Sequence, residues 1–295
     1  MKRIFAFGLA LIMILSATST AVFANIRGFR EEIRYETNEW IDDNHLIVLS
    51  KLGISQWASV YDMGTKVNEK MARWYVADYV TKLVDVETSK PAEFEAMFRD
   101  LTSEHQYYGK IKGVVEAGYM QGDPDGYFRP GEAITAREAA TVMLRVLGYT
   151  PYMEAFGVDK ALKKTGIMDG LELTDEMTHA QFLRMIYNAL NSPAVKQEVF
   201  STENGAMGYD VEHELDENYL GFEMLFGVVH ERAVLNAVKG TTLERGGDFV
   251  KDGFISIAGI DYKYEADVSD LLGYNVDYFY KENGGIRELI HLYKN

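Results

Sequence analysis

Three segments of the chain repeat one arrangement of hydrophobic and polar positions. In each, a short amphipathic stretch ends in glycine and an apolar residue, a loop follows, and a longer stretch carries apolar residues three and four positions apart. The segments span about residues 40–84, 105–149 and 156–191. Because a single helix pair cannot bury its own apolar face, we expect three pairs to stack into an all-α bundle over residues 25–194.

The second segment is the most regular of the three. Its first helix is expected to end at Gly118, and the loop carries the run Asp123-Pro124-Asp125-Gly126. Proline second and glycine fourth in this run predict a tight turn, whereas a calcium loop would need further oxygen ligands. Thr135 with Glu138 three residues later predicts a capping box, so the second helix should begin at about Thr135.

The other two segments follow the same pattern less closely. In the third, Thr178 and Gln181 repeat the capping box. In the first, the second helix is expected over about residues 68–84, and no comparable turn motif stands in its loop. The positions that correspond to one another in the three second helices are then, in chain order, Met71, Ile134 and Met177.

After Pro193 the pattern changes to alternation with a period of two. Residues 221–238 predict one or two strands, and hairpins are expected about residues 258–260 and about Asn283-Gly284-Gly285. About five short strands in this region favour a small β-barrel or β-sandwich over residues 219–295. The fold class predicted is therefore α followed by β, with the polar and acidic residues 195–218 as a linker.

The first 24 residues read as an export signal. Basic Lys2 and Arg3 precede an apolar run over residues 4–15, and Ala24 ends a small-x-small cleavage motif. That run is shorter than the roughly 20 residues that span a bilayer, although retention as an anchor stays open. We expect an exported protein that is free of the membrane after cleavage.

Charge and cysteine content narrow the functions further. The net charge is −15, and residues 196–295 hold 9 Lys and Arg against 19 Asp and Glu, a net charge of −10. Such a surface repels phosphate, so nucleic acid is not expected as a partner. The chain has no cysteine, which excludes disulfides and thiol catalysis.

No catalytic or metal-binding arrangement stands out in the sequence. The histidines have no metal-ligand spacing, and no serine lies in a Gly-x-Ser-x-Gly setting. The acidic run over residues 210–217 is more typical of a solvated linker than of a metal site. We therefore expect no metal, no cofactor and no enzymatic activity.

Residues 118–149, with the glycine-rich turn and the capped helix, resemble an S-layer homology (SLH) motif. Members of this family usually carry three copies, and their grooves bind a secondary cell-wall polymer that often bears a ketal-linked pyruvate. The resemblance implies non-covalent anchoring of a surface protein to wall polysaccharide. It covers nearly half of the chain without residues 1–24, weakly in the first segment and moderately in the third.

The family's helix-opening motif, approximately Ile-Thr-Arg-Ala-Glu, points to the binding residues. Arg73 occupies the arginine position in the first copy, His179 occupies it in the third, and Arg137 lies one position late in the second. The resemblance thus implies one polymer-binding groove in each copy, at Arg73, Arg137 and His179, with the glycines Gly53, Gly118 and Gly166 admitting the ligand near the backbone. We expect Arg73 to make the principal contact.

Two functions remain open from the sequence. In the first, the repeats dock the protein to the wall and the β region serves self-assembly or contact with other surface proteins. In the second, the β region is a polysaccharide-acting enzyme or its accessory module, although about 100 residues are few for an independent hydrolase.

Overall fold

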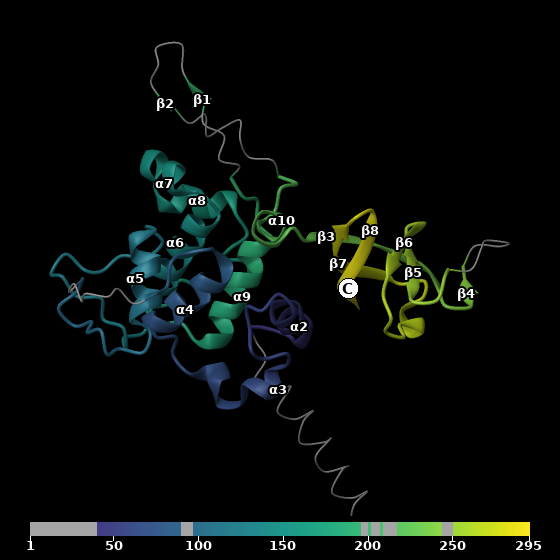
Figure 1. Ribbon diagram of the computed structural model, residues 1–295, viewed down its shortest axis with the longest axis horizontal. Helices are drawn as coiled ribbons and strands as arrows, with labels where there is room; N and C mark the ends of the chain where they lie inside the picture. The colour runs from purple at the N-terminus through teal and green to yellow at the C-terminus, as the bar shows by residue number, and fades with distance from the viewer. Residues whose placement is uncertain (1–39, 90–96, 196–199, 202–206, 209–216, 244–249) are drawn as a thin grey trace, which may run out of the picture.

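A computed structural model gives the arrangement of residues 40–89, 97–195, 200–201, 207–208, 217–243 and 250–295 (Figure 1). The predicted signal peptide and most of the predicted linker lie outside these described residues. The α-then-β order is confirmed, because helices occupy the N-terminal part and a six-stranded mixed sheet occupies the C-terminal part. Within the described residues, no helix combines the length and the apolar character needed to cross a membrane.

Three long helices, each preceded by a shorter helix, make up most of the helical part. The helices are α2 (Asp43–Lys51), α3 (Val60–Met63), η1 (Gly64–Asn68), α4 (Arg73–Leu83), α5 (Tyr108–Glu116), α6 (Ala136–Val146), α7 (Thr150–Phe156), α8 (Val158–Lys164), α9 (His179–Leu190) and α10 (Gly221–Phe226). Both predicted capping boxes are confirmed, at Thr135 with Glu138 and at Thr178 with Gln181. The helix predicted from about residue 68 begins later, at Arg73, because Lys70 and Ala72 are paired as extended bridges with Thr178 and Ala133.

A closed ring of three backbone hydrogen bonds joins the starts of α4, α6 and α9. The Met71 N–H donates to the Met177 carbonyl at 2.7 Å, Met177 to Ile134 at 3.0 Å, and Ile134 to Met71 at 2.9 Å. All three side chains are at most 1% exposed. Residues far apart in the chain therefore meet at one buried point, and the first turns of the three helices diverge from it.

Two further predictions concern the turn at residues 123–126 and the strand expected at the start of the β region. The tight turn is confirmed, since the Gly126 N–H donates to the Asp123 carbonyl at 2.9 Å. The strand predicted at residues 221–226 is wrong, because these residues form α10. Phe222 is fully buried in the helical core, so the burial available against α9 overrides the local strand pattern.

The strands are β1 (Phe200–Ser201), β2 (Met207–Gly208), β3 (Val229–Val238), β4 (Thr241–Thr242), β5 (Phe254–Ile257), β6 (Ile260–Lys263), β7 (Asn275–Asn283) and β8 (Ile286–Lys294), with η2 (Ser269–Leu271) before β7. Both predicted hairpins are confirmed, as β5–β6 and β7–β8. The short β1 and β2 pair with each other inside the region predicted as a linker.

The six-stranded sheet returns on itself. Its order is β4-β3-β5-β6-β8-β7, and β7 also pairs with β3 along six residue pairs from Val229↔Tyr280 to Val234↔Asn275. All pairings are antiparallel except β6 with β8. The side chains enclosed by these strands form a core of their own, with Leu235, Ile257, Tyr262 and Val276 fully buried.

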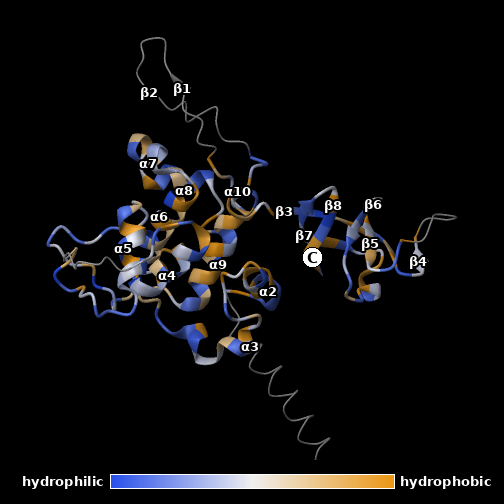
Figure 2. Ribbon diagram, viewed as in Figure 1, coloured by the Kyte–Doolittle hydropathy of each residue, from blue (hydrophilic) through white to orange (hydrophobic). Residues whose placement is uncertain are grey.

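One side of the β7–β8 hairpin packs against the helices. Phe279 belongs to the same buried cluster as the helical core, and His230 stacks on its ring at 4.2 Å between centroids. The Tyr187 hydroxyl of α9 lies 3.0 Å from the Tyr293 hydroxyl of β8. Figure 2 shows hydrophobic residues along α9, and the neighbouring helices α2 and α10 contact β8 and β3, respectively. The two parts thus share a contact surface made of rings and hydroxyls.

Candidate functional site

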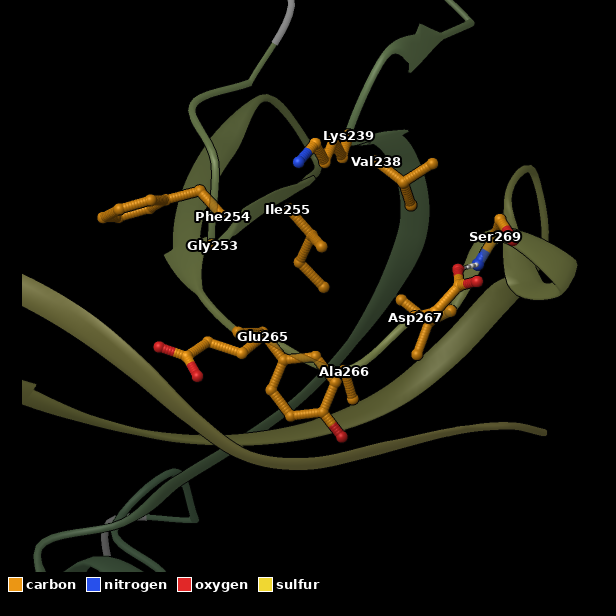
Figure 3. Close-up of a pocket in the computed structure, with 11 residues that line it drawn as sticks. Val238, Lys239, Gly253, Phe254, Ile255, Glu265, Ala266, Asp267 and Ser269 are labelled. Atoms are coloured by element: carbon orange, nitrogen blue, oxygen red, sulfur yellow. Dashed lines mark hydrogen bonds between the residues drawn. The ribbon is translucent and has the colours of Figure 1, made fainter.

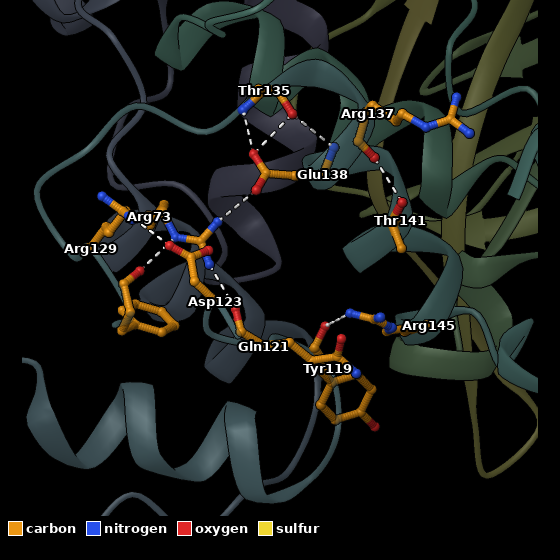
Figure 4. Close-up of polar contacts among 11 residues, drawn as sticks. Arg73, Tyr119, Gln121, Asp123, Arg129, Thr135, Arg137, Glu138, Thr141 and Arg145 are labelled. Atoms are coloured by element: carbon orange, nitrogen blue, oxygen red, sulfur yellow. Dashed lines mark hydrogen bonds and ion pairs between the residues drawn. The ribbon is translucent and has the colours of Figure 1, made fainter. Parts of the chain in front are cut away.

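A cavity of about 210 Å³ opens beside the first turn of α4. It lies between that turn, the loop after α5 and one face of α6 (Figure 4). Its walls are formed by Arg73, Met120, Gln121, Gly122, Asp123, Ile134, Glu138, Thr141, Val142 and Arg145.

Arg73 is the first residue of α4, and its guanidinium is held on every side. Its Nε donates to the Phe128 carbonyl and its Nη2 to the Gln121 carbonyl, both at 2.8 Å. Its Nη1 forms an ion pair with Glu138 Oε1 at 3.0 Å, and the group lies 5.0 Å from the Phe128 ring centre. Arg73 is only 8% exposed, so this charge is presented to the cavity in one fixed orientation.

Glu138 connects the cavity to the helix cap. Its Oε2 accepts from the backbone N–H and the hydroxyl of Thr135, at 3.0 and 2.9 Å, while its Oε1 accepts from Arg73. One carboxylate therefore satisfies the N-terminal end of α6 and positions the guanidinium. The same side chain that sequence patterning assigns to capping also belongs to the site.

Arg145 supplies a second cation on the far wall of the cavity. Its Nη1 donates to the Tyr119 carbonyl at 3.1 Å, and burial lowers the pKa of its guanidinium from the ordinary value. Asp123 is neutralised locally by its ion pair with Arg129. Two guanidiniums thus face one carboxylate, Glu138, and the arrangement suits an anionic ligand that also offers hydroxyl groups.

The starts of the three long helices occupy equivalent positions. Each first residue donates its backbone N–H to the strand-like segment before another helix, at 3.0 Å in every case: Arg73 to Glu132, Ala136 to Thr174, and His179 to Glu69. The side chain nine residues further along each helix also has a matching role. It donates to the carbonyl that follows a predicted site glycine: Arg145 to Tyr119, Asn188 to Ile167, and Lys82 to Ile54.

His179 occupies the position equivalent to Arg73 but has different neighbours. Its ring lies 4.6 Å from that of Tyr75 and 6.1 Å from that of Trp57, both edge-on. The side chain is 1% exposed, and neither ring nitrogen has a hydrogen-bond partner among the described residues. Burial lowers its pKa to about 4, which keeps the ring neutral at ordinary pH.

The remaining predicted residues lie outside the cavity. Arg137 is exposed, pairs with Asp159 of α8 at 2.6 Å, and in Figure 4 points away from Arg73. Gly53 and Gly118 adopt positive φ of +76° and +81° after α2 and α5, which only glycine takes without strain. A Cβ on Gly166 would lie 2.8 Å from the Asp169 carboxylate.

Several residues that line the cavity were not predicted as site residues from the sequence. Arg145 is seven residues after Glu138 and therefore on the same helix face, a spacing that could have identified it. Gly122 contributes a close approach, because a Cβ there would lie 2.2 Å from the Phe98 ring. The carbonyl groups of Gln121 and Phe128 carry no sequence signal, since any residue type supplies one.

Comparison with known proteins gives a match to one family model and several distant relatives. The family model of the S-layer homology domain matches residues 98–140, which include the loop and the first turn of α6 that line the cavity. Over 136 residues the chain is 25% identical to a middle cell wall protein of Brevibacillus brevis, and over 132 residues it is 26% identical to the S-layer protein sap of Bacillus anthracis.

A third relative is the surface layer protein of Brevibacillus choshinensis, 24% identical over 119 residues. These matches cover 45%, 36% and 39% of this chain for the proteins of B. brevis, B. anthracis and B. choshinensis, respectively. They cover only 12%, 16% and 11% of the relatives, so most of each relative has no counterpart here. One SLH domain and a distant relationship to surface-layer proteins follow from these matches.

Proposed function

We propose that this protein is exported and held non-covalently on the cell wall, where the cavity beside Arg73 binds a secondary cell-wall polymer. The observation that carries the proposal is the pair of guanidiniums, Arg73 and Arg145, around one cavity in a strongly acidic chain. The chain as a whole is strongly acidic, yet this cavity brings two arginines together. The SLH match over residues 98–140 supports the same assignment.

The ligand chemistry follows from the two cations. A sugar that bears a carboxylate, such as a ketal-linked pyruvate, would pair with the fork of Arg73 or Arg145, and its hydroxyls would reach Thr141 and the carbonyl oxygens of the loop. A neutral polymer would leave the positive charge of the site without a partner. We therefore favour a pyruvylated or otherwise acidic wall polysaccharide.

The domain proposal is three SLH copies, at about residues 40–84, 105–149 and 156–191, followed by a β domain at residues 219–295. The ring of hydrogen bonds among Met71, Ile134 and Met177 supports three related copies, as do the matching donors Lys82, Arg145 and Asn188. The β domain would carry self-assembly or contact with other surface proteins, in keeping with a structural protein and not an enzyme.

The test is sedimentation of the purified protein with wall sacculi, prepared with their polymer intact and with its pyruvate removed. We expect co-sedimentation with intact sacculi and at least tenfold weaker binding after pyruvate removal. Arg145→Gln should weaken binding, whereas the matched Arg137→Gln, on the same helix but outside the cavity, should not. Equal binding by all three proteins would contradict the proposal, and thermal unfolding of each variant checks that the fold is retained.

A further inference from the structure

The sheet contains a second cavity, of about 390 Å³, distant in the chain from Arg73. It lies at the end of β3, the start of β5 and the segment after β6 (Figure 3). The strand order around this cavity and the residues that line it both favour a sugar ligand. Neither observation depends on the function proposed for the helical part.

The strand connections are those of an OB-fold barrel. In chain order, β3, β5, β6, β7 and β8 are the first to fifth strands, and their neighbours run first, second, third, fifth, fourth and back to first. The third and fifth strands, β6 and β8, are parallel, and the other pairs are antiparallel. In barrels of this type, oligosaccharides and oligonucleotides bind over the second and third strands and the loops beside them.

The cavity lies next to those two strands, at the end of the barrel where the first strand leaves. Gly253, Phe254 and Ile255 come from the second strand and its entry, and the segment from Tyr264 to Ser269 leaves the third strand. The Tyr264 N–H donates to the Gly253 carbonyl at 2.7 Å, which joins these two walls. The described residues alone therefore form a continuous concave surface at the barrel end.

The lining groups divide by depth. Buried Val238, Ile255 and Val268 form an apolar floor, and the half-buried Tyr264 also packs against the barrel core, whereas the Phe254 ring points away from Ile255 (Figure 3). The rim carries exposed polar groups of both signs, Lys239, Glu265 and Asp267. Aromatic surface for the C–H face of a sugar and carboxylates for its hydroxyls are what a glycan requires.

The charge of the cavity and its surroundings distinguishes between the two ligand classes that OB-fold barrels bind, oligosaccharides and oligonucleotides. Two carboxylates, Glu265 and Asp267, belong to the rim of the cavity, while the rim cation Lys239 is already paired with Asp252 at 3.2 Å. Residues 196–295 carry a net charge of −10, which repels phosphate. We propose that this cavity binds a short stretch of uncharged or amino-bearing glycan, and so gives the protein a sugar contact separate from the Arg73 cavity.

Isothermal titration of the intact protein with N-acetylglucosamine hexamer, with its deacetylated form and with a thymidine oligonucleotide tests this proposal. We expect one or both sugar oligomers to bind and the oligonucleotide to give no heat. Tyr264→Ala should weaken sugar binding at least tenfold, and Arg145→Gln, in the other cavity, should leave it unchanged.

A rim variant and a control keep the test decisive. Glu265 is exposed, so the Glu265→Gln variant should fold normally. Because the substitution removes a negative charge from the rim, it should weaken the binding of the deacetylated oligomer most. Asp261→Asn, exposed on β6 and outside the cavity, should bind as the parent does. The proposal is overturned if neither sugar binds at millimolar concentration, if both cavity variants bind normally, or if the oligonucleotide binds more tightly.

Discussion

Arg73 and His179 stand at equivalent places, each the first residue of a long helix whose start belongs to the hydrogen-bond ring, yet their surroundings differ. The side chain three positions into the helix of the neighbouring segment is Glu138 beside Arg73 and Tyr75 beside His179. Inward carbonyl groups and a carboxylate hold a buried cation in one place, and aromatic rings enclose a neutral imidazole in the other. The backbone repeats, but the charge of each position depends on which neighbours accept hydrogen bonds.

The strongest test of this comparison is Arg73→Met. The change should abolish wall binding and lower the free energy of unfolding by about 2 kcal/mol, because two buried carbonyl oxygens and Glu138 lose their donor. Urea unfolding and sedimentation with sacculi measure the two effects separately. His179→Met should leave wall binding intact, and loss of binding in that variant would mean that both positions contact the polymer.

The pH dependence of stability offers a second test. His179 has a folded-state pKa of about 4 against an ordinary value of 6.5, so the unfolded state takes up the proton first. His179 therefore leaves the free energy of unfolding independent of pH above about pH 6.5 and lowers it as pH falls from 6.5 toward 4, by at most about 1.4 kcal/mol per pH unit.

Urea unfolding at pH 7, 6, 5 and 4.5 should therefore show a shallower pH slope in His179→Phe than in the parent protein. The other histidines whose pKa values burial lowers remain in both proteins and contribute to the slope that persists; they are His45, His105, His230 and His291. Identical slopes would show that His179 is protonated within the fold or is solvated there.

A smaller effect is expected from His179→Phe at neutral pH. Both ring nitrogens are buried without a partner in the described structure, so an apolar ring of similar size removes an unmet desolvation cost. We expect the free energy of unfolding to rise by about 1 kcal/mol. A loss of stability on calorimetric or urea unfolding would indicate a water or a polar group bound to the imidazole.

The smallest effects separate the two capping boxes. Thr135→Ala and Thr178→Ala should each lower the free energy of unfolding by about 1 kcal/mol. Only Thr135→Ala should also weaken wall binding, by a fewfold, because Thr135 holds the carboxylate that orients Arg73. Equal wall binding by the two variants would show that the cap of α6 does not influence the cavity.

Local signals predicted many of the elements correctly. The capping pairs place the starts of α6 and α9, and glycine-containing turns place the β5–β6 and β7–β8 hairpins, because these features depend on residues within a few positions of one another. The wrong prediction at α10 arose because contacts with distant residues override the local pattern there. Its apolar residues suit a strand locally, but Phe222 is buried against helices formed more than 30 residues earlier.

The sequence by itself determined the repeat pattern, the caps, the turns and the identity of Arg73 as a candidate. Only the tertiary structure decided that the acceptors of Arg73 lie 48, 55 and 65 residues away, and that Arg145 stands across the same cavity. It likewise decided that β7 returns to β3 and that His179 is neutral. Desolvation and backbone acceptors depend on which distant segments meet, and periodicity along one segment carries no record of that.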